Sequence, residues 1–312
     1  MILVTGGTGF IGRNLVRQLV DNGYPVRLLL KPSPKTPKVP LGVPVEVAVT
    51  SINDERGLRA AMRGVDTIFH LAGGEGLGIR TNLERIDVDG THSLVNAAAS
   101  SRLKKIFFLS HLGADRSSGF PILKAKGMAE EHIRNSGIPY SIIRSSIVFG
   151  PEDGISTGLA LLIHTSPGFL PMPSNGKTLL QPLWIEDLVT CLLWAMDMPD
   201  LVNKTIEIGG GEYLSIEQIT RTIMESIKKK RKLLFWPNPY MRALTILAEY
   251  MFPGFPSSIF WLDYMAVNRT CAVNSLPRYF DIMPARFSKK LHHLQDVNWN
   301  RKLLDRIFKK NS

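Results

Sequence analysis

Closely spaced glycines interrupt the apolar start of the chain and leave few folds open to it. Ile2–Val4 is a short apolar run, long enough for a buried parallel strand, and glycine then fills four of the seven positions in Gly6–Gly12. Apolar residues return at helical spacing over Ile11–Val20. Strand, glycine turn and helix in this order typify a dinucleotide-binding unit, because glycines let backbone N–H groups approach the pyrophosphate at a helix N-terminus. The sequence therefore predicts an α/β fold with a parallel sheet.

Length and composition fit one large α/β domain with a smaller lobe. The chain has 312 residues, of which 44% are hydrophobic and 21% charged. Its two cysteines, Cys191 and Cys271, are far apart and indicate neither a disulfide framework nor a metal site. We therefore expect a reducing compartment, either the cytoplasm or an organelle matrix or stroma. We also expect no targeting peptide and no transmembrane helix, because no run of about 18 apolar residues occurs.

The end of the predicted second strand, Pro25–Lys31, favours NADP(H) over NAD(H). An NAD enzyme of this kind usually has a carboxylate near this strand end, which binds the ribose 2′-hydroxyl. Here no Asp or Glu occurs between Asp21 and Glu46, and a cation can pair with a 2′-phosphate instead. Lys31 is the best candidate and Arg13 a second, with solvated loop lysines as the alternative reading. The cations of the interval are Arg27, Lys31, Lys35 and Lys38.

Strand and helix patterns alternate along the rest of the chain and predict a Rossmann doubly wound parallel sheet with a smaller C-terminal α/β lobe. We expect a dinucleotide-binding domain over residues 1–150, with a sheet strand and helix returning near 178–210. Residues 151–177 and 211–312 would form the lobe for a substrate or partner. The further predicted elements are strands at Val45–Val49, Thr67–Gly73, Lys105–Ser110, Pro139–Ser146 and Thr205–Gly210, and helices at Asn53–Met62 and Asp87–Ala99.

Three local signals lie beyond residue 150. The sequence Ser-Asn-Gly-Lys at Ser174–Lys177 predicts a turn at a hairpin tip. Asp187 is expected to cap a helix over Leu188–Met196 rather than to act in chemistry. Ser215 precedes another helix, whose first turn is acidic.

Several motifs resemble the short-chain dehydrogenase/reductase superfamily. The glycines fit both the general register Gly7-x-Gly9-x-x-Gly12 and the superfamily's Gly6-x-x-Gly9-x-x-Gly12. Over nearly its whole length the chain resembles the atypical group that contains the NADPH-binding accessory subunit of respiratory complex I and its bacterial and plastid relatives. This resemblance implies a Rossmann fold and a bound dinucleotide, commonly without turnover. The motifs that carry it are Val4–Gly12, His70–Gly73, Lys126-x-x-x-Glu130, Arg144–Gly150, Gln181–Asp187 and Asn274–Phe280 with Met283-Pro284.

The superfamily's catalytic residues are only partly matched. The resemblance implies a catalytic Ser or Thr at the end of the fifth strand, which Ser110 fits, followed by Tyr-x-x-x-Lys. Lys126 fits the lysine and puts Ile122 in the tyrosine position, whereas alignment on Lys124 puts Phe120 there. Neither has a hydroxyl, and no Tyr in the chain has a Lys four residues later. The motif is therefore degenerate, since a Tyr hydroxyl with a Lys-lowered pKa is the usual acid.

The resemblance also implies which residues contact the dinucleotide. His70–Gly73 is similar to the stretch that passes the adenine ribose and diphosphate, although His70 itself is predicted to be a packed strand residue rather than a base. The superfamily often has Asn where Asp87 or Asp89 falls. The implied contacts are Gly6, Thr8, Gly9, Phe10, Ile11, Gly12, Lys31, Leu71, Ala72, Gly73, Ser110, Lys126 and Arg144.

The net charge of +11 is concentrated at the C-terminal end. Residues 1–219 carry 21 Lys and Arg against 21 Asp and Glu, whereas residues 220–312 carry 17 against 6. The basic run Lys228–Lys232 precedes a long aromatic, nearly uncharged stretch, which we expect to form mostly lobe core and pocket lining. Residues 228–262 also suit a hydrophobic protein partner or an anionic membrane surface, with peripheral attachment. Nucleic-acid binding ranks last, because no RNA-binding module is recognisable.

Two hypotheses share cofactor binding and differ in turnover. The first is an NADP(H)-binding protein without ordinary dehydrogenase chemistry, which serves as a structural, assembly or sensing component. The second is an NAD(P)-dependent oxidoreductase or epimerase/dehydratase that uses another acid, with Ser110, His111 and Lys126 near the nicotinamide. The sequence names no substrate for either.

Overall fold

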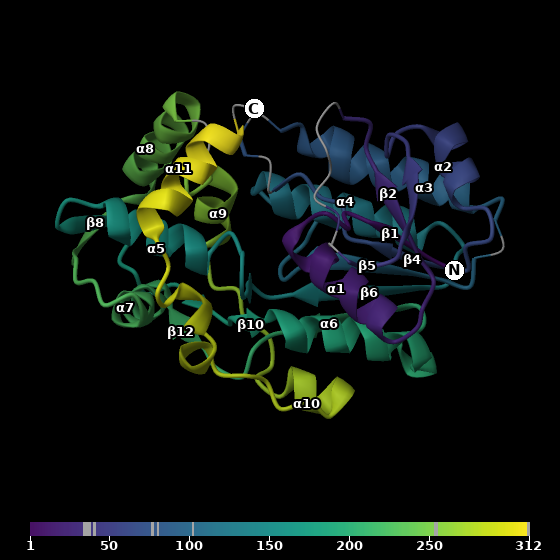
Figure 1. Ribbon diagram of the computed structural model, residues 1–312. Coiled ribbons are helices and arrows are strands. Elements are labelled where there is room, and N and C mark those ends of the chain that lie inside the picture. Colours follow the sequence, from purple (N-terminus) through teal and green to yellow (C-terminus); the bar gives the residue numbers. More distant parts are fainter. Residues whose placement is uncertain are drawn as a thin grey trace. The chain divides into compact units, whose positions relative to one another are not determined.

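The apolar runs predicted as strands pair in one parallel sheet in the computed structural model, which describes residues 1–33, 39, 42–75, 78–79, 81–101, 103–252 and 255–310 (Figure 1). Within these residues the sheet has seven strands in the order β11-β6-β5-β4-β1-β2-β3. The order reverses between β1 and β4, which is where open α/β sheets bind ligands. The predicted doubly wound sheet is confirmed. Its strands are β1 (Ile2–Thr5), β2 (Val26–Leu30), β3 (Glu46–Val49), β4 (Thr67–His70), β5 (Lys105–His111), β6 (Tyr140–Ser145) and β11 (Lys204–Ile208).

Helices cover both faces of this sheet (Figure 1). Helices α1 and α6 pack together on one face, and α2, α3 and α4 pack on the other. Helix α1 shows why: Leu15, Val16 and Leu19 recur at helical spacing and are all buried. The helices are α1 (Phe10–Asp21), α2 (Glu55–Ala61), α3 (Gly90–Ala98, continuing the π-helical turn η2, Glu84–Asp89), α4 (Pro121–Arg134) and α6 (Ile185–Trp194).

The core of this unit lies between the sheet and helices α2–α4. Leu3, Ile68 and Ile106 on three adjacent strands are fully buried and belong to one apolar cluster with Leu94 of α3 and Ile133 of α4. Strands buried on both faces carry continuous apolar runs rather than alternating ones, as expected for a parallel sheet. The unit comprises Met1–Glu75, Asn82–Ser145 and Ile185–Ile208.

The second unit comprises Gly76–Thr81, Ser146–Trp184 and Gly209–Ser312. Its described residues form three two-stranded sheets, which pair β7 with β10, β9 with β12 and β8 with β13. The remaining elements are β7 (Val148–Phe149), β8 (Phe169–Pro173), β9 (Leu179–Leu180), β10 (Leu183–Trp184), β12 (Leu214–Ser215), β13 (Lys232–Trp236), α5 (Ser156–Thr165), α7 (Ile216–Ser226), α8 (Asn238–Met251), α9 (Ile259–Tyr264), α10 (Ser275–Phe280) and α11 (Trp299–Lys310).

Two local predictions beyond residue 150 were wrong and one is confirmed. A turn forms at Ser174, but β8 before it pairs in parallel with β13, and β9 after it pairs with β12, so no hairpin joins them. Helix α6 already begins at Ile185, which places Asp187 within the first turn instead of ahead of it. The helix predicted after Ser215, with an acidic first turn, is confirmed as α7, and the side chains of Ser215 and Gln218 accept from each other's backbone N–H groups.

A buried carboxylate ties α4 to the sheet. Glu130 is fully buried, and its oxygens accept from Arg134 of the same helix at 2.5 Å and from Arg144 of β6 at 2.8 and 2.9 Å. Arg144 also donates to the Ala114 carbonyl at 2.9 Å. Because the two arginines neutralise Glu130, the charge is stable in an otherwise apolar layer.

We expect Glu130→Gln to lower the free energy of unfolding by about 2–3 kcal/mol, because it leaves two arginines without their shared charge. This loss of unfolding free energy is smaller than that for a fully buried pair, because both arginines remain partly exposed. Urea denaturation measures it. The matched control is Glu131→Gln, one residue on, which removes only the surface pair with Arg116 and should cost less than about 1 kcal/mol. Equal losses in both variants would contradict a structural role for the Glu130 pair.

Candidate functional site

The turn after β1 needs glycine at two positions for its own packing. Gly6 has φ +71°, and a Cβ there would lie 2.6 Å from the Leu71 backbone. A Cβ at Gly12 would lie 2.2 Å from the Gly6 carbonyl oxygen. Gly9 differs, because a Cβ there would meet only that same oxygen, at 3.2 Å, and its φ of −75° suits any residue. Gly9, at the N-terminus of α1, is thus less constrained by the protein itself than Gly6 and Gly12, although a Cβ there would be tight against this oxygen.

A buried histidine joins the strands on either side of the switch point. His70 ends β4, and its Nδ1 lies 2.7 Å from Thr5 Oγ1 at the end of β1. Its Nε2 lies 2.9 Å from Thr91 Oγ1 of α3. The Thr91 hydroxyl donates to the Asp87 carbonyl, so its oxygen accepts from His70 Nε2–H and leaves Nδ1 to accept from Thr5. The neutral imidazole therefore hydrogen-bonds with both threonine hydroxyls, accepting from Thr5 and donating to Thr91.

The pKa of His70 follows from this environment. Burial, and secondarily the nearby positive charge of Lys126, lowers it from the ordinary 6.5 to about 3. A protonated ring would also lose its bond from Thr5, because it has no acceptor nitrogen. His70 is thus a packed strand residue, as predicted, and burial holds its ring in the neutral form.

Lys126 lies in a buried cluster of charges at the carboxyl ends of β4 and β5. Its Nζ is 2.9 Å from Asp87 Oδ1 and 4.0 Å from Glu75 Oε2, and Lys126 and Asp87 are both almost fully buried. Asp87 Oδ2 also accepts from the Gly74 backbone N–H at 2.9 Å. Gly73 makes the cluster possible, since a Cβ there would come within 2.5 Å of Glu75 and 3.0 Å of Lys126.

The carboxylates keep Lys126 charged. Burial by itself would lower the pKa of Lys126, but the charges of Asp87 and then Glu75 outweigh burial and raise that pKa above its ordinary value. A lysine with a raised pKa gives up its proton less readily. Asp87 thus has a specific structural partner at a position where the superfamily often has Asn.

A second pair in this cluster was missed by the sequence analysis. His111 Nε2 at the end of β5 lies 3.5 Å from Glu75 Oε1. Burial would raise the pKa of Glu75, but Lys126 and His111 outweigh it and hold that pKa well below its usual range, so Glu75 is ionised. Next to His111, the Ser110 hydroxyl is buried and has no hydrogen-bond partner among the described residues. Glu75 lies two residues after the His70–Gly73 motif, and this spacing is the sequence feature that could have identified it as a site residue.

The structure brings most of the predicted site residues to one edge of the sheet. The turn Gly6–Gly12, the segment Leu71–Gly73 and Ser110 follow or end β1, β4 and β5, and Lys126 joins them through Asp87. Lys31 is exposed directly after β2. Arg144 is instead held by Glu130 and the Ala114 carbonyl. Ile122 is buried, one helical turn before Lys126. Lys35 and Lys38 lie outside the described residues.

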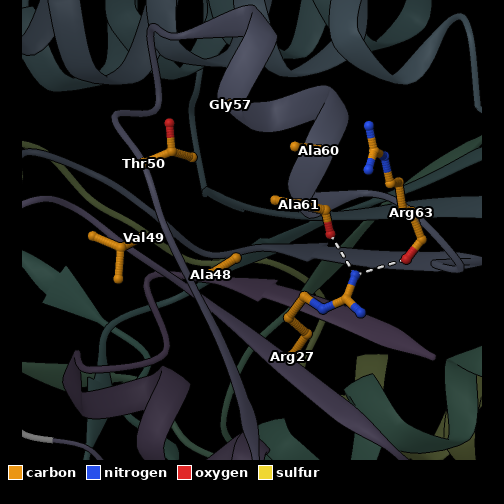
Figure 2. Close-up of a pocket in the computed structure, with 8 residues that line it drawn as sticks. All are labelled: Arg27, Ala48, Val49, Thr50, Gly57, Ala60, Ala61 and Arg63. Atoms are coloured by element: carbon orange, nitrogen blue, oxygen red, sulfur yellow. Dashed lines mark hydrogen bonds between the residues drawn. The ribbon is translucent and has the colours of Figure 1, made fainter.

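A pocket of about 430 Å³ lies at the edge of the same sheet, between α2 and the strands β2 and β3 (Figure 2). Arg27 donates from Nη1 to the carbonyls of Ala61 and Arg63, both at 2.7 Å, and pairs with Glu46 on β3. Arg27 is therefore engaged by the protein, whereas Lys31, directly after the end of β2, is exposed and shows no partner among the described residues. The pocket is lined by Arg27, Ala48, Val49, Thr50, Gly57, Ala60, Ala61 and Arg63.

Neither a metal cluster nor a membrane span is evident in the described part of the chain. No three His, Cys, Asp or Glu side chains gather there in an arrangement that could hold a metal ion. Likewise, none of the helices described combines the length and the apolar character that crossing a bilayer requires.

Comparison with known proteins points to nicotinamide dinucleotides. Residues 6–161 match a sequence family described as NAD(P)H-binding. The chain is 27% identical over 276 residues to NADH dehydrogenase (ubiquinone) 1 alpha subcomplex subunit 9, mitochondrial, of Arabidopsis thaliana, covering 83% of this chain and 67% of the relative. It is 33% identical to sterol demethylase protein B of Methylococcus capsulatus, covering 79% and 80%. The fold matches UDP-glucose 4-epimerase of Thermotoga maritima with a TM-score of 0.73 at 20% identity, covering 97% and 99%.

We expect the buried, neutral His70 to lower the free energy of unfolding as the pH decreases. Its folded-state pKa lies below its unfolded one, so its contribution is complete above about pH 6.5 and is lost as the pH falls toward 3. Between pH 7 and pH 5 the wild type should lose about 2 kcal/mol more unfolding free energy than His70→Gln. Urea denaturation at both pH values measures this. The control, His292→Gln at an exposed site, should keep the wild-type pH dependence; identical slopes for wild type and His70→Gln would refute the assignment.

Proposed function

Because the chain belongs to the NAD(P)H-binding family and to the atypical short-chain dehydrogenase/reductase superfamily, we propose that the dinucleotide it binds is NADP(H) and that it has little or no dehydrogenase turnover. Its role is then structural, or in assembly or sensing. One observation carries this proposal: Ile122, which has no hydroxyl, stands four residues before Lys126, where the superfamily's acid would be. Positioned acid catalysis typically contributes about 10²–10⁴-fold to such reactions.

The residues at the carboxyl ends of β1 and β4 fit a dinucleotide. Gly9 lies at the N-terminus of α1, where backbone N–H groups and the helix dipole favour phosphate. Gly6, Gly9 and Gly12 would hold the pyrophosphate, and Leu71–Gly73 would lie along the adenosine side. Lys31, exposed after β2 in a stretch of sequence that has no Asp or Glu between Asp21 and Glu46, would pair with a 2′-phosphate.

The state of Lys126 supports low turnover. When bound, a reduced nicotinamide supplies a hydride, and a carbonyl substrate also needs a proton. Lys126 is held by Asp87 at 2.9 Å and its pKa is raised, so it is a poor substitute for the absent tyrosine. The related Arabidopsis protein is named as a subunit of a larger dehydrogenase, which agrees with a role as a component.

The pair of Glu75 and His111 favours a second candidate function, an NAD(P)-dependent oxidoreductase or epimerase/dehydratase with a different acid. His111 would deliver its imidazolium proton to the oxygen of the substrate carbonyl, and solvent would restore it. Glu75, ionised 3.5 Å away, would orient the imidazole ring of His111. The relative named sterol demethylase protein B agrees with an enzymatic role.

We expect NADPH to bind at least about tenfold more tightly than NADH, since one charge-assisted hydrogen bond contributes about 1.5 kcal/mol or more. Isothermal titration calorimetry with both cofactors measures the ratio. Lys31→Ala should bring the two affinities together by weakening NADPH alone. Lys204→Ala, at an exposed lysine that begins β11, is the control and should change neither. A preference for NADH in the wild type would refute the role of Lys31.

The location of the cofactor is checked in the same titrations by a matched pair of glycine variants. Gly9→Val should abolish binding, because its side chain would take the space of the pyrophosphate. Gly119→Val adds the same group where a Cβ meets no atom within 4 Å, and should bind normally. A folded Gly9→Val protein with full affinity would mean that the dinucleotide lies elsewhere.

We expect negligible NADPH oxidation with a panel of quinones, aldehydes, sugar nucleotides and sterol-like ketones, assayed by absorbance. Robust turnover with any of these, lost in His111→Gln while NADPH affinity is kept, would instead establish the second candidate function. Turnover that survives His111→Gln and is lost in Lys126→Met would assign the proton to Lys126. The surface variant His292→Gln controls for loss of an imidazole as such.

A further inference from the structure

Both charged side chains of helix α8, in the second unit, are engaged by residues of α9. The helix packs on α9 and β8 (Figure 1). Its only two charged residues are Arg242, which pairs with Asp263 of α9, and Glu249, whose Oε2 accepts from the Ile259 backbone N–H at 3.0 Å. Met241 and Thr245 are the buried residues of the helix. Both charges of α8 are therefore paired with α9, while the Arg242 side chain stays 47% exposed.

The opposite face of α8 is apolar and exposed. Tyr240, Leu244, Leu247 and Met251 follow one another at intervals of four, three and four residues, which places them on one side of the helix. Leu247 is 55% exposed and Met251 59%. These four residues are called the α8 face below. An amphipathic helix normally buries such a stripe, and a contiguous exposed one marks a binding surface.

Basic and aromatic residues border the α8 face along the chain. Strand β13 leads directly into α8, and its last two residues, Phe235 and Trp236, are exposed. Its first residue, Lys232, is exposed too, and lies about 13 Å before Trp236 at the rise of a strand. The exposed residues Lys228–Lys230 precede it. An apolar stripe, an aromatic rim and a cluster of cations thus follow one another within 24 residues, Lys228–Met251.

We propose that the α8 face is a docking site for the surface of an anionic lipid bilayer. The α8 face would enter the boundary between headgroups and acyl chains, where Tyr and Trp are preferred. Lys228–Lys230 and Lys232 would contact the acidic headgroups. Apolar and cationic contacts together give stable peripheral attachment, which either alone gives poorly.

Charge complementarity favours lipid over a second copy of the chain. A symmetric dimer sets the same patch against itself, so the cations bordering one α8 face would meet those of its partner. Residues 220–312 carry 17 Lys and Arg against 6 Asp and Glu, and on α8 the one carboxylate, Glu249, is turned inward. Within Lys228–Met251 Glu249 is the only carboxylate, so this stretch offers four exposed lysines and no second acidic group to a copy of itself.

Flotation of the full-length protein with vesicles tests the proposal. Vesicles of phosphatidylcholine with about 30% phosphatidylglycerol should carry the protein, and pure phosphatidylcholine should carry about tenfold less. The double variant Leu244→Glu with Leu247→Glu should lower binding to the anionic vesicles at least about tenfold. The matched control, Val267→Glu with Val273→Glu, puts two charges at similarly exposed apolar sites of the same unit and should bind like the wild type.

A second variant tests the cations separately from the helix. Replacing Lys228, Lys229 and Lys230 by Gln should lower binding at least about tenfold at low salt and abolish most of its salt dependence. Three results would overturn the proposal: no binding of the wild type to anionic vesicles, unchanged binding of the Leu244→Glu, Leu247→Glu variant, or self-association in sedimentation that this variant removes. NADPH affinity should be unchanged in all variants, so a failure of cofactor binding would count against the proposed function and not against lipid docking.

Discussion

The arrangement of the candidate site depends on the close approach of two backbone segments at the switch point of the sheet. Gly6 passes so near Leu71 that a single Cβ cannot fit, and it adopts a left-handed φ to do so. Thr5 and His70, the residues before them, are joined by a buried hydrogen bond. The turn that would hold phosphate and the segment that would pass the adenosine are thereby fixed to each other, before any ligand is present.

The same junction extends into the charged cluster. His70 bonds to Thr91, Thr91 to the Asp87 carbonyl, and the Asp87 carboxylate to Lys126. Each charge of the cluster has a partner of opposite sign or a hydrogen-bonding group nearby. Asp87 and Glu75 both lie beside Lys126, and His111 lies beside Glu75. Such a cluster in low dielectric is rigid when its groups are paired, since separating any pair leaves a buried charge. Rigidity of this kind suits a binding protein as well as an enzyme.

How much could be predicted from the sequence depended on the range of the interactions. Apolar runs and local spacing were enough to predict the strands, the glycine turn and a parallel sheet. They also predicted that His70 is packed within a strand. The prediction of a hairpin at Ser174 was wrong because β8 pairs with β13, about 60 residues further along the chain, and local sequence does not reveal such a partner. The partner of Arg144 could not be predicted either. Glu130 lies on helix α4, and the sequence alone does not identify which strand this helix packs against.

The sequence by itself determined the doubly wound class, the glycines that only a tight turn explains, and the absence of a hydroxyl at Ile122. These are properties of residue type at fixed spacing, and folding cannot change them. Only the tertiary structure decided that Lys126 is held by Asp87, that Glu75 reaches His111, and that both charges of α8 pair with α9. Each of these depends on which side chains meet across elements, and long-range packing rather than local propensity fixes that geometry.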